Sequence, residues 1–269
     1  MEYVTLSNGI KMPLVGFGTW DLRGSKCIDS VLEALNCGYR LIDTAKMYQN
    51  EREVGVAIQN SHIPREKLFI TTKLDRHYNN YQSAKKGILE SLKVMQLDYL
   101  DLVLIHEPYS HSLKMYQALE EAYDQGLIKA IGVSNFHYTY FKNFIKNCKI
   151  IPMVNQVETH VFFQQQKLQP ILAKNQTVME AWSPLATGKN NLFELKELVE
   201  IGNVYHKTAA QIALKYLIQL GIVVIPKSAH KKRMEENIDL FDFDLTEDQM
   251  AIIKKLDTNQ SLFNWYDYQ

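Results

Sequence analysis

Four side chains suited to proton transfer stand at or just after the ends of three consecutive apolar runs. They are Asp43, Tyr48, Lys73 and His106. Each alone has an ordinary structural explanation, because an Asp after a strand often caps a helix and a Lys at a strand end usually reaches solvent. An acid, a phenol, an amine and an imidazole together indicate a shared site for acid–base chemistry.

Tyr48 is the candidate proton donor of this set. A tyrosine has an ordinary pKa of about 10, which is too high for brisk proton donation at neutral pH. A neighbouring ammonium lowers that pKa, and we expect Lys73 to supply it, with Asp43 as its buried counter-ion. His106 would then hold a carbonyl oxygen beside Tyr48.

The later apolar runs are followed by groups of a different kind. Ser134-Asn135 and Gln156 are neutral hydrogen-bonding residues that suit a carboxamide, and Trp182-Ser183 offers a flat ring for stacking. The run 227–233 is densely basic. Such a run is usually a solvated face, but this one opens a predicted helix, where phosphate is favoured. The combination is typical of a site for a nicotinamide dinucleotide with an extra phosphate.

The elements that must position these residues alternate between strand and helix. The eight predicted strands are Leu14 to Phe17, Leu41-Ile42, Leu68 to Thr72, Leu100 to Ile105, Ile128 to Val133, Met153-Val154, Thr177 to Ala181 and Ile222 to Ile225. Helical spacing of apolar residues separates them, for example over Ser83 to Met95 and Ala209 to Leu220, with an extra helical stretch near Leu192 to Ile201. Eight such units predict a single (β/α)8 barrel domain over residues 1–269.

An N-terminal β-hairpin precedes the barrel, because Val4-Thr5-Leu6 and Ile10-Lys11-Met12 flank Ser7-Asn8-Gly9. An open doubly wound sheet is the rival architecture. The sequence lacks the glycine-rich G-x-G-x-x-G motif of that fold, since Gly16-Phe17-Gly18 has no third glycine in place.

Composition limits the partners. The 269 residues carry 30 Lys+Arg and 30 Asp+Glu, so the formal net charge is +0 and broad nucleic-acid or membrane binding is not expected. Three cysteines without a CxxC pair indicate a reducing compartment, and no signal peptide or membrane-length apolar run is found. We expect a cytoplasmic monomer that acts on a small-molecule substrate.

The chain resembles the aldo-keto reductase family from end to end. The matching segments are Gly16-Phe17-Gly18-Thr19-Trp20, Ile42-Asp43-Thr44-Ala45, Tyr48-Gln49-Asn50-Glu51, Thr72-Lys73, Leu104-Ile105-His106, Gly132-Val133-Ser134-Asn135-Phe136, Asn155-Gln156-Val157-Glu158, Ser183-Pro184-Leu185, and Ile225-Pro226-Lys227-Ser228 with Arg233, Glu236 and Asn237. Each piece is short, but nine in this order are highly specific.

The resemblance implies reduction of aldehydes or ketones to alcohols by hydride transfer from NADPH. Tyr48 would be the general acid, Lys73 and Asp43 would tune it, and His106 would orient the substrate. Cofactor contacts would be Ser134, Asn135, Gln156, Trp182, Ser183, Leu185, Lys227, Ser228, Arg233, Glu236 and Asn237. Trp20, Tyr48, His106 and Glu107 would line the substrate pocket, and no metal is implied.

The chain departs from the family pattern in several places. Trp182 stands where Tyr is usual, and Gln49 where many members have Gly. Glu107 stands where many have Trp, and a carboxylate there would raise the pKa of His106 and repel anionic substrates. The alternative is that Glu107 points to solvent or pairs with a nearby Lys. The tail 261–269 is short and aromatic, is similar to that of compact microbial members such as the 2,5-diketogluconate reductases, and would border the pocket.

Two alternatives come from other functional classes. A cofactor-binding regulatory subunit with little turnover could keep all four candidate catalytic residues. A metal-dependent barrel hydrolase needs several His or Asp ligands at strand ends, whereas His106 is the only His at a predicted one. The physiological substrate does not follow from the sequence, because loops and tail select it.

Overall fold

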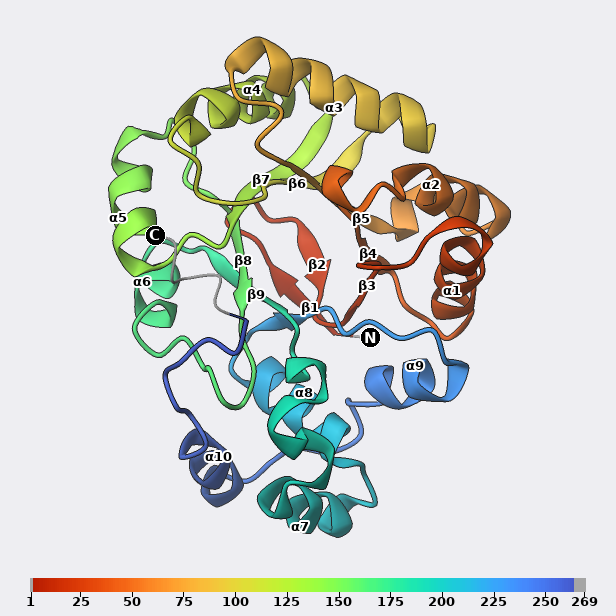
Figure 1. Ribbon diagram of the computed structural model, residues 1–269, viewed down its shortest axis with the longest axis vertical. Coiled ribbons are helices and arrows are strands. Elements are labelled where there is room, and N and C mark those ends of the chain that lie inside the picture. The colour runs from red at the N-terminus through yellow and green to blue at the C-terminus, as the bar shows by residue number, and fades with distance from the viewer. Residues whose placement is uncertain (1, 264–269) are drawn as a thin grey trace.

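The computed structural model of the protein describes residues 2–263. A two-stranded antiparallel hairpin, β1 (Tyr3–Thr5) and β2 (Lys11–Pro13), lies across one end of a barrel (Figure 1). Gly9 adopts a positive φ of 87° in its turn, a conformation that favours glycine. The side-chain amide of Asn8 donates to the carbonyl of Lys129, which ties the hairpin to the barrel.

Eight strands form one parallel sheet in the order in which they occur along the chain. They are β3 (Gly16–Gly18), β4 (Leu41–Asp43), β5 (Phe69–Leu74), β6 (Leu100–Ile105), β7 (Ile128–Ser134), β8 (Val154–Glu158), β9 (Val178–Trp182) and β10 (Val223–Val224). A parallel bridge between Val15 and Val224 joins the first strand to the last and closes the barrel. The predicted barrel is therefore confirmed, and each predicted strand overlaps an observed one.

Helices surround the sheet on its outer face (Figure 1). They are α1 (Gly24–Asn36), α2 (Glu51–Asn60), α3 (Tyr81–Met95), α4 (Ser112–Asp124), α5 (Tyr138–Phe144), α6 (Gln169–Lys174), α7 (Lys196–Tyr205), α8 (Ala209–Gln219), α9 (Lys231–Ile238) and α10 (Glu247–Lys254), with short 3-10 turns η1 (Lys46–Tyr48), η2 (Arg65–Lys67), η3 (Ile145–Asn147) and η4 (Ala186–Glu194). The extra helix predicted near Leu192 to Ile201 is α7, displaced by a few residues. None of the described helices is both long and apolar enough to cross a membrane.

Close packing where the barrel closes requires glycine in β3. A Cβ at Gly16 would meet the end of the Leu41 side chain, which can move, and one at Gly18 would lie 2.9 Å from the carbonyl oxygen of Ile225. The second of these contacts is with backbone, which cannot move aside without opening the barrel. The motif Gly16-Phe17-Gly18 is thus a seam of the barrel and not a phosphate-binding turn.

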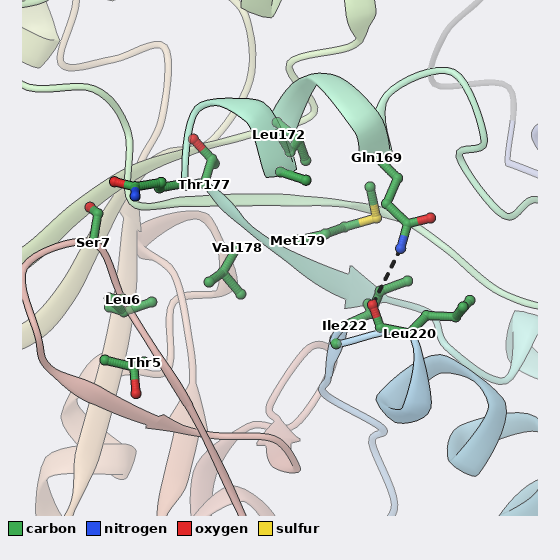
Figure 2. A pocket seen from close by; sticks show the side chains of 13 residues that line it. Thr5, Leu6, Ser7, Gln169, Leu172, Thr177, Val178, Met179, Leu220 and Ile222 are labelled. Atoms are coloured by element: carbon green, nitrogen blue, oxygen red, sulfur yellow. Dashed lines mark hydrogen bonds between the residues drawn. The ribbon is translucent and has the colours of Figure 1, made fainter.

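A hollow of about 410 Å³ lies at the amino end of the barrel, between the hairpin and the start of β9 (Figure 2). Its wall is neutral, with Thr5 and Ser7 facing Thr177 and Val178, and Gln169 donates a hydrogen bond to the carbonyl of Leu220 across one side. None of the residues that line it is titratable. The hollow therefore offers no group for acid–base chemistry.

Candidate active site

A larger cavity of about 920 Å³ opens at the carboxyl ends of the strands. Fifteen of the residues predicted from the sequence line it, namely Trp20, Asp43, Tyr48, His106, Ser134, Asn135, Gln156, Trp182, Ser183, Leu185, Lys227, Ser228, Arg233, Glu236 and Asn237. Lys73 lies beneath this surface with no exposure to solvent. The parallel strands bring residues as distant in the sequence as Trp20 and Asn237 to one rim, which is why strand ends were informative.

Lys73 holds the centre of the site together. Its Nζ lies 2.6 and 2.7 Å from the two carboxylate oxygens of Asp43, 3.0 Å from the carbonyl oxygen of Thr44 and 3.3 Å from the hydroxyl of Tyr48. Asp43 is the last residue of β4 and Lys73 is the last but one of β5, so two adjacent strands set this geometry. Both side chains of the ion pair are buried, and the ammonium that Asp43 holds in place also contacts the Tyr48 hydroxyl.

Tyr48 is placed by a short turn with a buried anchor. It ends η1, and Gln49 after it is left-handed with φ of 55°. This conformation explains why glycine suits the position. Asn50, fully buried, donates to the carbonyls of Thr19 and Leu22 and fixes the end of the turn.

Burial and charge compete at Lys73 and Tyr48, with different outcomes for the two groups. Burial lowers the pKa of Lys73, but the neighbouring Asp43, Tyr48 and Glu180 together outweigh burial, so the net pKa is raised. Burial raises the pKa of Tyr48, and Lys73 offsets this only in part. Lys73 acts in the expected direction, but the net pKa of Tyr48 lies above its ordinary value, because desolvation of the phenolate exceeds the attraction of the ammonium. Tyr48 accordingly stays a protonated donor.

His106 completes the polar end of the cavity. Its ring lies 5.7 Å from that of Tyr48, centroid to centroid, at an interplanar angle of 73°. Burial, with a smaller contribution from Lys73, lowers the pKa of His106 to about 3. Its imidazole is therefore neutral at physiological pH, and its Nδ1 has no hydrogen-bond partner among residues 2–263.

The prediction that Glu107 raises the pKa of His106 is wrong, because that pKa is lowered and Glu107 is not among its causes. Glu107 is half-buried beside Arg76 and Asp75, and burial raises its own pKa. It is not among the described residues that line the cavity. The loop after β6 turns its carboxyl toward the loop after β5, so the structure gives no support to a substrate contact.

Glu180 is a buried acid in the site that sequence reasoning missed. It lies in β9 opposite Gln156 of β8, and the Gln156 Nε2 donates to Glu180 Oε2 at 2.9 Å and to Asp43 Oδ2 at 2.8 Å. Burial and the nearby Asp43 carboxylate raise the pKa of Glu180. A single Glu inside the apolar run 177–181, two residues before Trp182, was the available signal.

The predicted carboxamide side is a connected polar network. Asn135 has a left-handed φ of 62°, donates from Nδ2 to the carbonyl of His106 and accepts at Oδ1 from the Trp182 indole at 2.8 Å. Ser134 donates its hydroxyl to the backbone carbonyl of Gln156. Three strand ends, β7, β8 and β9, are thereby fixed relative to one another.

The basic end of the cavity lies where α9 begins. Ser228 and His230 exchange hydrogen bonds that shape the turn into the helix. Among residues 2–263, no carboxylate forms an ion pair with Lys227 or Arg233, whereas the neighbouring Lys231 pairs with Glu33. Two cations without an ion-pair partner in the described part of the chain thus lie near the N-terminus of α9 at the cavity wall, a setting that favours an anion.

Aromatic residues also line the cavity. Trp20 is 56% exposed and meets the Tyr48 ring at 4.9 Å, while Phe263 meets the Trp182 ring at 5.3 Å. Phe263 also lines the cavity, held in place because buried Glu158 accepts hydrogen bonds from Ser261 and from the Leu262 amide. The expectation that the tail borders the pocket holds for this part; residues 264–269 lie outside the described residues.

Within residues 2–263, no group of three or more His, Cys, Asp or Glu side chains is arranged to hold a metal ion. The titratable groups at the strand ends instead line a cavity of about 920 Å³ whose wall also holds the cations Lys227 and Arg233 and several aromatic rings. This arrangement suits a long anionic ligand beside a small polar one.

Comparison with known proteins agrees with this geometry. Residues 14–258 match the model of the aldo/keto reductase family. The chain is 39% identical to methylglyoxal reductase DkgA of Escherichia coli K12 and 40% identical to glyoxal reductase of Bacillus subtilis 168; each match covers 96% of this chain and 94% of the relative. Among solved structures, an aldo-keto reductase from a Medee basin deep-sea metagenome library, MGS-M4, superposes with a TM-score of 0.94 at 42% identity over 97% of both chains.

The match to the family model covers most of the barrel, and the sequence identities extend over nearly the whole chain. The resemblance seen in nine short motifs is thereby confirmed. The chain belongs to the aldo/keto reductase family, and it is an oxidoreductase that reduces carbonyl groups.

Proposed function

We propose that the protein reduces aldehydes and ketones with NADPH and that Tyr48 donates the proton. The observation that carries this proposal is the position of Lys73, whose ammonium contacts both the Asp43 carboxylate and the Tyr48 hydroxyl at the floor of the cavity. One domain supplies every residue of the site. A protonated phenol with an ammonium behind it suits a reaction in which negative charge develops on a substrate oxygen.

The residues present fit NADPH. Lys227 and Arg233 are cations at the cavity wall without ion-pair partners among the described residues, and they suit the 2′-phosphate. Ser134, Asn135 and Gln156 would bind the carboxamide, Trp182 would stack on the ring, and Glu236 and Asn237 would face the adenine. When bound, NADPH supplies the hydride.

The protein's own residues would then manage the charge on the substrate. The neutral His106 imidazole can donate one hydrogen bond to the carbonyl oxygen, and the Tyr48 hydroxyl can donate another. As Tyr48 gives up its proton, the adjacent ammonium of Lys73 stabilises the phenolate that forms. The Asp43 carboxylate holds that ammonium in place throughout.

Small dicarbonyls are the substrate class that we propose, because the relatives of known name include a methylglyoxal reductase and a glyoxal reductase. We further infer that the protein works as a monomer in the cytoplasm. Its three cysteines are all free, which suits a reducing compartment.

The test is turnover of a carbonyl panel with NADPH and with NADH, followed by loss of nicotinamide absorbance. We expect reduction of methylglyoxal and of simple aldehydes, with NADPH preferred. Tight NADPH binding without turnover of any carbonyl would favour the regulatory-subunit alternative and overturn the proposal.

A further inference from the structure

Glu180 has no role in the proton transfer outlined above, yet it lies at the centre of the barrel with no exposure to solvent. Burying a carboxyl group carries a large cost unless hydrogen bonds compensate it. Only one of its oxygens has a partner among the described residues, since Oε2 accepts from Gln156 and Oε1 accepts from nothing. Because Gln156 is the hydrogen-bond partner of this buried carboxyl group, the role of Glu180 is sought in what it does to Gln156.

The partner is an amide whose two faces are chemically opposite. A glutamine amide nitrogen carries two N–H donors and its oxygen is an acceptor, so a turn of the amide by 180° exchanges donor for acceptor. Both N–H groups of Gln156 are used, one by Asp43 Oδ2 at 2.8 Å and one by Glu180 Oε2 at 2.9 Å. Asp43 alone would satisfy one donor and leave the second free.

We propose that Glu180 is a positioning residue for the cofactor: with Asp43 it fixes the Gln156 amide so that Oε1 is the atom presented to the cavity, and the site therefore selects a ligand amide that donates an N–H. This inference rests on the proposed function, because it takes Gln156 as a carboxamide contact. It assigns to Glu180 the discrimination between a nicotinamide and a ring that bears a different acyl group.

The charges around Glu180 are compatible with this role. The groups that face it are Asp43 from β4, Lys73 from β5 and Gln156 from β8. Lys73 is already paired with Asp43. Burial and the negative charge of Asp43 both raise the pKa of Glu180, which favours its neutral form. A carboxylic acid can still accept through its carbonyl oxygen, so the orientation of Gln156 does not depend on ionisation.

The variant Glu180→Gln tests the proposal, because a glutamine there can donate to Gln156 Oε1 and removes the bias against the turned amide. We would measure dissociation constants of NADP+ and of its 3-acetylpyridine analogue, whose methyl ketone has no N–H, by quenching of tryptophan fluorescence. We expect NADP+ binding to weaken about tenfold, as for loss of one hydrogen bond in a buried site, and binding of the analogue to change less than twofold.

The matched control is Glu120→Gln, another buried glutamate, which accepts from the Ile150 amide outside the cavity lining. It should change neither dissociation constant. A second variant, Glu180→Asp, keeps a carboxyl acceptor for Gln156 and should bind NADP+ more tightly than Glu180→Gln does.

Equal weakening of both ligands in Glu180→Gln would show a merely structural role and overturn the inference. Unchanged NADP+ binding would overturn it as well. Failure of the wild-type protein to bind NADP+ at all would instead refute the proposed function, so the two failures are distinguishable. The folded state of each variant is checked by its thermal unfolding midpoint before binding is measured.

Discussion

The barrel buries an ion pair at each end, and the two pairs serve different purposes. At the carboxyl end, Lys73 and Asp43 are almost fully buried and the ammonium also contacts the hydroxyl of Tyr48. At the amino end, Arg65 and Asp101 approach to 2.6 Å, and their side chains are 20% and 12% exposed. Both pairs join neighbouring strand segments, so burial of opposite charges does not by itself identify a catalytic site.

The difference lies in the remaining partners. Arg65 donates to the carbonyls of Leu68 and Tyr99 and its guanidinium lies over the Tyr99 ring, and Asp101 accepts from the backbone amide of Ile70. None of these residues lines either of the two cavities described above. Lys73 instead contacts Asp43 and Tyr48, which both line the larger cavity. A buried charge indicates function when part of its hydrogen-bonding capacity is directed at a group that a ligand can reach.

The largest effect is expected from a substitution in the site at the carboxyl end of the barrel that leaves the fold unchanged. Tyr48→Phe should lower kcat about 10²–10⁴-fold, because the phenol supplies general acid help, while NADPH still binds. Steady-state kinetics and a fluorescence titration with NADPH measure the two quantities. Near-normal turnover in this variant would remove Tyr48 from the mechanism and leave Lys73 without a catalytic target.

The converse change breaks the amino-end pair. Asp101→Ala should lower the free energy of unfolding by about 2–3 kcal/mol, because it leaves a partly buried guanidinium and the Ile70 amide without an acceptor. The kcat/KM of the folded variant should stay within twofold of wild type. Urea unfolding and kinetics on the same sample check both; a large loss of kcat/KM with unchanged stability would show that the two ends are not functionally separate.

Protonation of His106 should distinguish the two ends further. Its pKa is lowered to about 3 in the folded protein, so below the ordinary value near 6.5 the unfolded chain binds a proton that the folded chain does not. Stability contributed by this group is therefore present above pH 6.5 and is lost as the pH falls toward 3. Between pH 7 and pH 5 the loss should be about 2 kcal/mol.

His106→Gln should remove this part of the pH dependence of the free energy of unfolding, measured in urea at pH 7 and pH 5. In the wild-type protein, kcat/KM should show no inflection near pH 6.5 from His106. An unchanged pH dependence of stability in the variant would show that His106 titrates normally and that its burial is smaller than the structure indicates.

The smallest expected effect concerns the cavity itself. Arg233→Ala should weaken NADPH binding about tenfold and leave NADH almost unchanged, because only NADPH carries the phosphate that a charge-assisted bond would hold. Lys232→Ala is the matched control, since Lys232 is exposed in the same turn and pairs with Glu236 instead of lining the cavity. Equal weakening of both cofactors by Arg233→Ala would show that this arginine does not read the phosphate.

The sequence alone located most of this site because a parallel barrel converts order along the chain into position around a rim. Asp43, Lys73 and His106 could be found as polar residues that end apolar runs, and the strands that carry them are now adjacent in the sheet. Gln49 was noted as a departure from glycine, and its left-handed backbone supplies the reason. Local pattern and topology were sufficient for these residues.

The sequence could not predict the pKa values and side-chain contacts that depend on burial in the folded protein. Whether the net pKa of Tyr48 falls depends on how strongly burial opposes the effect of Lys73, and the effect of burial is the larger. Glu107 follows His106 in the chain, yet the turn after β6 directs it toward Arg76. Glu180 looked like one more residue of a strand, and only the register between β8 and β9 places it against the Gln156 amide.

The sequence by itself therefore determined the eight-fold alternation, the family and the residue types at each strand end. The tertiary structure decided which of those residues face the cavity, which partners saturate them and what their proton affinities become. The physical reason is that hydrophobic periodicity is a local property of the chain. Desolvation and charge pairing depend instead on all neighbours in space, and these come from strands far apart in the sequence.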